Sequence, residues 1–115
     1  MKTYRQELTI ITDENEQFLN LSYEVEECVR RSLIKDGLCT VFSKHTTSAV
    51  FLDNDREGLI ADWTEMLNKI VPKESSYKVD YTSAGAAHMK QMLIGAGVTV
   101  PITDGRLELG PRQYI

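Results

Sequence analysis

The sequence LCTVFSKHTTSAVFL (residues 38–52) places a polar segment between two apolar runs. The first run, residues 38–43, is rich in apolar and β-branched side chains and predicts a buried β-strand. The second run, residues 49–52, predicts that the strand resumes. Five consecutive polar residues, 44–48, are costly to bury unless they have hydrogen-bond partners. This segment is therefore either a polar turn at the end of a strand or one edge of a binding site.

Upstream of this stretch the sequence predicts two strands and a helix. The strands are expected at residues 4–12 and 18–21, with a polar turn between them. Ser22 is placed as the N-cap of the helix, and Asp36-Gly37 supplies its C-terminal stop. The buried stripe of this helix has helical spacing and comprises Val25, Cys28, Val29 and Leu33.

Downstream the sequence predicts two more helices and a hairpin. Residues 53–55 can cap a helix that Pro72 ends, and its stripe is the strongest periodic signal of the chain: Leu59, Ile60, Trp63, Met66, Leu67 and Ile70. A third helix is expected after Ser83, to about Ile94. Strands at 98–102 and 106–109 flank Asp104-Gly105, a strong hairpin signal, and Pro101 predicts that the first of them is an edge strand or carries a bulge.

The element order β-β-α-β-β-α-α-β-β predicts an α+β fold with a mostly antiparallel sheet. The 115 residues have room for one domain, spanning 1–115. A net charge of −4 lacks the basic surface that nucleic-acid binding requires. The sequence shows no signal peptide and no apolar run of about 20 residues, so we expect a cytoplasmic protein without a membrane partner. Cys28 and Cys39 are expected to act as small core hydrophobes.

The segment 44–48 is the first candidate site. Its imidazole, three hydroxyls and one ammonium group suit an anion- or metal-binding edge. His88 is the second candidate, because the small residues before it, 84–87, allow a ligand to approach closely. Asp62 lies beside the apolar stripe of its helix and could orient a histidine or a cation. Each of these residues also has a plain structural reading, as a turn, a helix-surface histidine or a surface acid.

In their order and spacing, several short motifs resemble those of the YjbQ-like family. They are His45-Thr46-Thr47-Ser48-Ala49, Asp62, Ala87-His88, Val100-Pro101, Gly105 and Leu109-Gly110-x-x-Gln113. The resemblance covers the whole chain. It implies a compact α+β sandwich with two or three helices, assembled as a homotrimer.

The family is commonly described as secondary thiamine-phosphate synthases. The resemblance therefore implies a transferase that joins hydroxymethylpyrimidine diphosphate to thiazole phosphate and releases pyrophosphate. It implies catalytic roles for His45, Asp62 and His88, with the two histidines as metal ligands. The implied metal is zinc or another transition metal, or magnesium with a diphosphate substrate. The residues expected to bind a small phosphorylated substrate are Lys44, Thr46, Thr47, Gly105, Arg112 and Gln113.

The chain departs from the family pattern at three informative places. Family members carry a histidine in a Y-x-H-D motif where this chain has Val79, so one metal ligand is lost unless Asp80 or a water replaces it. Arg112 stands in place of an aromatic residue and could clamp an anion. Family members also continue past Gln113 for about one more strand pair, so we expect either a truncated sequence or a sheet that is completed differently.

Two functions therefore compete. The first is an enzyme of the thiamine-phosphate synthase type. The alternative is a non-catalytic protein that binds a small ligand or a metal on the same scaffold, and the valine at position 79 favours it.

Overall fold

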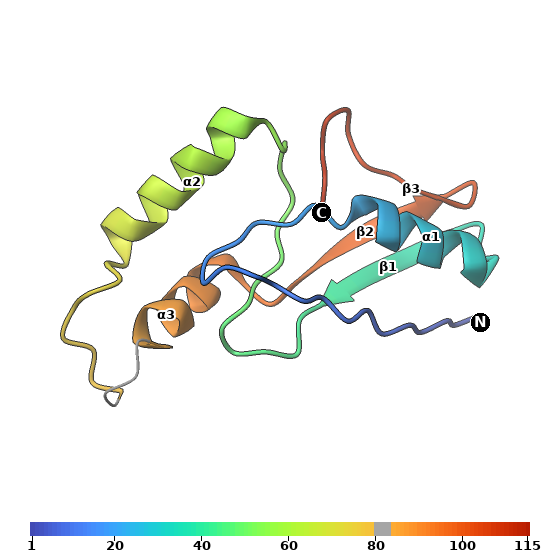
Figure 1. Ribbon diagram of the computed structural model, residues 1–115. Coiled ribbons are helices and arrows are strands. Elements are labelled where there is room, and N and C mark those ends of the chain that lie inside the picture. The colour runs from blue at the N-terminus through green and yellow to red at the C-terminus, as the bar shows by residue number, and fades with distance from the viewer. Residues whose placement is uncertain (80–83) are drawn as a thin grey trace.

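A three-stranded antiparallel sheet and three helices make up the computed structural model over the residues that it describes, 1–79 and 84–115 (Figure 1). In chain order they are α1 (Ser22–Ser32), β1 (Gly37–Phe42), α2 (Glu57–Ile70), α3 (Ala84–Ile94), β2 (Gly97–Thr103) and β3 (Arg106–Leu107). The strand order is β1-β2-β3. The predicted α+β class is confirmed. Among the described helices, none is both long and apolar enough to cross a membrane.

β1 and β2 form the longest ladder, from Gly37 opposite Ile102 to Phe42 opposite Gly97. Successive side chains alternate between the two faces of the sheet. On one face β2 contributes Val100, which is 1% exposed, and Ile102, which is 5% exposed. α1 lies over the sheet in Figure 1 and buries Val25 and Val29. The core of the molecule therefore lies between α1 and one face of this sheet.

The other face of the sheet is open. Leu38 is 72% exposed and Phe42 is 65% exposed, and both point to the side opposite the core. Between them the hydroxyls of Thr40 and Thr99 are hydrogen-bonded at 3.2 Å. This face is apolar and carries no charged side chain along β1, which is unusual for a surface that stays in water.

The hairpin prediction is confirmed, and the prediction for Pro101 is wrong. Asp104 and Gly105 both have positive φ, 53° and 77°, as a two-residue hairpin turn of type I′ requires. β2 is the central strand rather than an edge. It tolerates Pro101 because the missing N–H faces β3 just where that strand ends, after Leu107, and the Pro101 carbonyl still accepts from Glu108 N at 2.8 Å.

The strands predicted at residues 4–12, 18–21 and 49–52 are not formed. Residues 4–12 are extended and exposed but have no strand partner within the described ranges, and β propensity needs a neighbouring strand to pack against. Residues 49–52 run as a loop that Val50 N ties to Gly95 O at 3.1 Å.

The predicted helix caps lie one or more residues from the real ones. Ser22 is inside α1 and its hydroxyl accepts from Ile115 N at 2.8 Å, while Leu21 takes the N-cap position. α1 ends earlier than predicted, with Leu33 in the left-handed conformation at φ 59°. Tertiary hydrogen bonds to the C-terminus thus replace the local cap that the sequence suggests. Arg56, one residue after the predicted 53–55 cap, is the N-cap of α2.

α2 extends away from the sheet and buries none of its residues fully (Figure 1). Its main anchor is Trp63, whose ring lies 5.3 Å from that of Phe18 and 5.0 Å from that of Phe51. The radius of gyration is 16.0 Å, whereas a compact chain of this length has about 13 Å. The chain is therefore more extended than the compact sandwich that the family resemblance implies.

Gly85 is where α3 meets the preceding loop. A Cβ at this position would lie 2.7 Å from Tyr77 Cβ, a contact that neither residue could avoid by rotating a side chain. Gly85 is buried, and the Tyr77 hydroxyl donates to the carbonyl of Pro72. Glycine is therefore needed here for close approach.

We expect Gly85→Ala to lower the free energy of unfolding by about 1–3 kcal/mol, because overpacking outweighs the gain in helix propensity. Gly58 of α2 is the matched control, since a Cβ there would meet nothing within 4 Å. Gly58→Ala should instead stabilise by about 0.5–1 kcal/mol. Urea unfolding followed by Trp63 fluorescence measures both, and equal effects of the two substitutions would contradict the packing argument.

The ion pair between Glu16 and Lys90 should make the free energy of unfolding depend on pH in the acidic range. The hydrogen bond from Lys90 lowers the pKa of the Glu16 carboxyl below its usual range. A carboxylate whose pKa is depressed by folding stabilises the protein above the unfolded-state pKa, and this contribution is lost as pH falls through the folded-state pKa. Unfolding measured from about pH 6 to pH 3 should lose less stability in Glu16→Gln than in wild type. A parallel loss in both, with Glu14→Gln as control, would refute this.

Candidate functional site

The polar segment 44–48 forms a loop that leaves the end of β1. Ser43 and Ser48 close its neck through a hydrogen bond between their hydroxyls. Ser43 N donates to Ala96 O at 2.8 Å, so the neck is also attached to the short connection between α3 and β2. The side chains of residues 44–48 are exposed. The structure thus has the polar turn at the end of a strand that the sequence allowed, while a role as the edge of a binding site stays a prediction.

The loop presents its polar groups to solvent. The imidazole of His45 and the hydroxyls of Thr46 and Thr47 are exposed. Lys44 Nζ lies 3.1 Å from a carboxylate oxygen of Glu7, and this hydrogen bond lowers the pKa of the Glu7 carboxyl. Both side chains of the pair are about two-thirds exposed, so the pair contributes little to stability. Lys44 can therefore exchange Glu7 for another anion at small cost.

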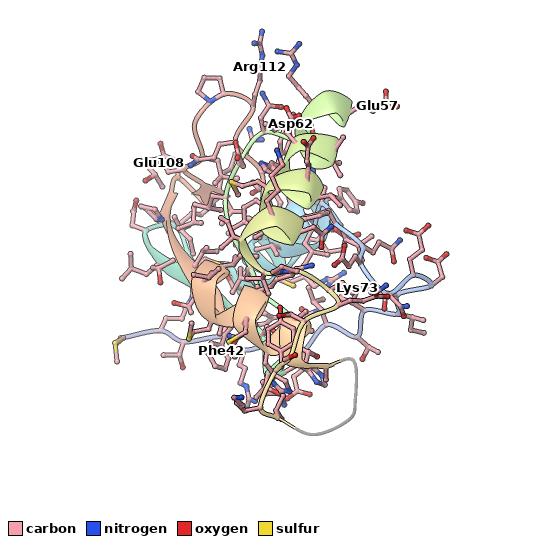
Figure 2. All side chains as sticks on the ribbon, turned by 90° about the vertical axis from the view of Figure 1, so that its left-hand side faces the viewer. Phe42, Glu57, Asp62, Lys73, Glu108 and Arg112 are labelled. Atoms are coloured by element: carbon pink, nitrogen blue, oxygen red, sulfur yellow. The ribbon has the colours of Figure 1, made fainter. Side chains whose placement is uncertain are left out.

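His88 lies half-buried in the middle of α3. The backbone bonds from Ser43 and Val50 to residues 95–96 tie the loop that carries His45 to the C-terminal end of this helix. The elements that bear the two histidines are thus joined through the backbone. Asp62 is different, since it is exposed on α2, toward the same end of the molecule as Glu57 (Figure 2).

A metal site needs three or four protein ligands or open positions filled by water. Within residues 1–79 and 84–115, no group of three His, Cys, Asp or Glu side chains is arranged to hold a metal ion. Val79, at the family's histidine position, is 46% exposed and offers no donor atom. Asp80, the suggested substitute, lies outside the described residues. The donors that the structure describes therefore do not make a transition-metal site, and metal binding by His45 and His88 stays a prediction.

The remaining predicted substrate-binding residues have clear structural roles. Gly105 supplies the positive φ of the hairpin turn, and its N–H donates to Lys35 O at 2.9 Å. Gln113 closes a turn, since its side-chain oxygen accepts from Gly110 N at 2.9 Å. Arg112 is exposed with a φ of 61° and projects from the end of the molecule that carries the start of α2 (Figure 2). Substrate binding by these three residues stays a prediction.

The two thiols lie in the elements where the sequence placed them. Cys28 is in α1 and Cys39 is in β1, both half-buried and free. Burial, with smaller contributions from Cys28 and Glu26, raises the pKa of the Cys39 thiol. A thiol whose pKa is raised is protonated at neutral pH and is a poor nucleophile.

Sequence reasoning missed a polar cluster around Lys90, which we call the Lys90 junction. It comprises Lys90 of α3, Glu16 of the N-terminal segment and Asn68 of α2. Lys90 Nζ donates to Asn68 Oδ1 at 2.7 Å and pairs with the Glu16 carboxylate. One signal was available, because Lys90 is the single charged residue in the helix sequence AGAAHMKQMLI.

A shallow apolar groove of about 340 Å³ lies close to this junction. It is formed by the end of α2, the loop that follows and the outer face of α3. Its lining comprises Ile70, Val71, Pro72, Ser75, Tyr77, Met89, Met92 and Leu93.

Comparison with known proteins agrees with this fold. The family model described as UPF0047 protein YjbQ-like matches residues 6–115. A UPF0047 protein of Archaeoglobus fulgidus is 37% identical over 110 residues, covering 95% of this chain and 85% of that protein. A UPF0047 protein of Methanothermobacter thermautotrophicus is 33% identical over 116 residues, covering 100% of this chain and 81% of that protein.

Solved structures show the same relationship. An uncharacterized conserved protein of the YjbQ/UPF0047 family from Clostridium acetobutylicum superposes with a TM-score of 0.87 at 30% identity, covering 91% of this chain and 81% of that one. A YbjQ-like protein of unknown function from Sulfolobus solfataricus gives 0.79 at 27% identity, covering 84% and 70%. From the fold, the motifs and these matches, the chain belongs to the YjbQ-like UPF0047 family.

Proposed function

We propose that this protein is a small-ligand-binding member of its family, and that the ligand is a phosphorylated small molecule bound at the loop 44–48 and His88. The observation that carries the proposal is the closed, exposed loop that collects an imidazole, two threonine hydroxyls and an ammonium group. These groups are hydrogen-bond donors, and phosphate oxygens are acceptors. The attachment of the loop to residues 95–96 supports the inclusion of His88, because α3 ends at that connection.

Binding without catalysis fits the described side chains better than the synthase reading. A transferase that expels pyrophosphate must stabilise the charge of the leaving group with fixed donors or a cation, and must exclude water from the reacting carbon. Here His45, Thr46 and Thr47 are open to solvent, and Asp62 is exposed on α2. The relatives named above carry no stated substrate. Thiamine-phosphate synthesis is therefore a second, more specific proposal, which a direct assay tests.

The experiment is titration calorimetry with inorganic pyrophosphate, with and without Mg²⁺. We expect Thr46→Val and His45→Ala each to weaken binding by about tenfold or more, the usual cost of losing a hydrogen bond to a charged group. Thr99→Val is the matched control, because this hydroxyl pairs with Thr40 on the open face of the sheet and should leave affinity unchanged.

Absence of binding by the wild-type protein, or an equal loss in Thr99→Val, would contradict the proposal. The same protein samples also test the synthase activity and the metal site. Thiamine phosphate formed from its two precursors above a His45→Ala control would establish the synthase reading. A stoichiometric transition metal in wild type that is lost in His45→Ala and His88→Ala would establish the metal site.

We also propose that the protein assembles with copies of itself, as a trimer, through the open face of the sheet. The part of the face along β1 suits a second copy because it is apolar, carries no charged side chain, and has its Thr40 and Thr99 hydroxyls already paired. Leu38 and Phe42 are largely exposed on it, which is costly for a monomer in water. The large radius of gyration also supports a subunit that is completed by its neighbours.

Light scattering should give about three times the 13.0 kDa mass of the chain. Leu38→Asp should shift the mass toward the monomer, because it buries a charge at the contact. Tyr23→Asp is the control, since Tyr23 is 74% exposed on α1, on the other side of the sheet. A monomeric wild type, or equal dissociation in both variants, would overturn the assembly proposal.

A further inference from the structure

Lys90 is unusual among the charged residues of this protein because its side chain is only 12% exposed. Lysine is rarely buried unless it is paired, since removing an ammonium group from water is costly. Both of its partners are provided by distant segments, Glu16 being 74 residues away and Asn68 22 residues away. The other lysine pairs of the described residues are exposed, as in Lys69 with Glu65. Lys90 is therefore a largely buried lysine whose two partners both come from distant parts of the sequence.

The N-terminal segment engages both helices at neighbouring positions. Glu16 pairs with Lys90 of α3, and two residues later Phe18 packs against Trp63 of α2. Asn68, about one and a half turns beyond Trp63, completes the link from α2 to Lys90. Residues 16–18 therefore link the two helices through one ionic contact with α3 and one aromatic contact with α2.

In the part of the chain that the structure describes, α2 and α3 bury few of their residues. No residue of α2 is fully buried, and the buried residues of α3 are Gly85 and Ala86, near its start. Lys90 lies a little more than one turn further along α3 and follows Met89, which lines the apolar groove. The Lys90 junction therefore joins the two helices whose ends contribute to the lining of this groove.

We propose that Lys90 is a positioning residue, which through Glu16 and Asn68 holds α3 at a set distance from α2 and so places both His88 and the groove. The part that concerns His88 rests on the proposed function. The part that concerns the separation of the helices does not, because it follows from the junction alone. Loss of the junction frees one end of each helix while the β1–β2 sheet stays intact.

The test is amide hydrogen exchange of the full chain, read separately for the helices and for the sheet. In Lys90→Met, which keeps most of the length of the side chain but removes its charge, we expect about tenfold faster exchange in the second halves of α2 and α3 and in residues 13–18. Exchange in β1 and β2 should stay as in wild type. Glu16→Gln, which keeps the shape of the side chain, should give a smaller change in the same segments.

Two controls make the result specific. Lys69→Met removes an exposed lysine pair from the same helix α2 and should leave exchange unchanged. In the double variant Glu16→Gln/Lys90→Met the effects should be less than additive, because both changes break the same contact. Unchanged exchange in α2, or an equal rise in helices and sheet, would overturn the positioning role. If Lys90→Met does not fold, Glu16→Gln decides the question by the same criteria.

Pyrophosphate affinity of the same variants separates this inference from the proposed function. Weaker pyrophosphate binding in Lys90→Met together with faster exchange in α2 supports both the positioning role of Lys90 and the proposed function. Faster exchange in a protein whose wild type binds no pyrophosphate supports the positioning of the helices and overturns the proposed function. Unaltered exchange with normal pyrophosphate binding overturns the positioning role and leaves the proposed function standing.

Discussion

The six-residue pairing of β1 with β2 organises the core and the candidate site of this protein. One face of the pair packs against α1 and forms the core around Val100. At one end of β1 the chain turns out into the loop 44–48, and the same end of β2 receives the chain from α3. The candidate site therefore depends on a strand pairing whose own residues take no part in it.

Because α1 covers only one face of the sheet, apolar side chains elsewhere in the chain stay exposed. The uncovered face keeps Leu38 and Phe42 in contact with solvent, and α2 extends from the body with its apolar stripe only partly covered. Burial of apolar surface is the main driving force for folding and association. The open face and the exposed helix thus have the same cause, which is that one short sheet and one helix cannot cover the apolar surface of this chain. Assembly with further copies is the simplest arrangement that would cover it.

The candidate site was predictable in its composition and not in its geometry. The polar run 44–48 is visible in the sequence because it interrupts two apolar runs, and His88 is visible because its neighbours are small. The hydroxyl bond that closes the loop is not visible because it depends on the conformation of the loop, and the backbone bond to Ala96 is not visible because it joins distant segments. Lys90 was overlooked for the same reason, since its partners lie in two other segments.

The sequence by itself determined the α+β class, the three helices, the hairpin at Asp104-Gly105 and the elements that carry the two cysteines. These features follow from local rules, namely periodicity, turn chemistry and burial of small apolar residues. Only the tertiary structure decided which extended segments become strands. Residues 4–12 have the side chains of a strand but no strand partner among residues 1–79 and 84–115, whereas Pro101 lies in a central strand because β3 ends where its N–H would be needed. Strand formation depends on hydrogen bonds between distant segments, and no local pattern specifies those partners.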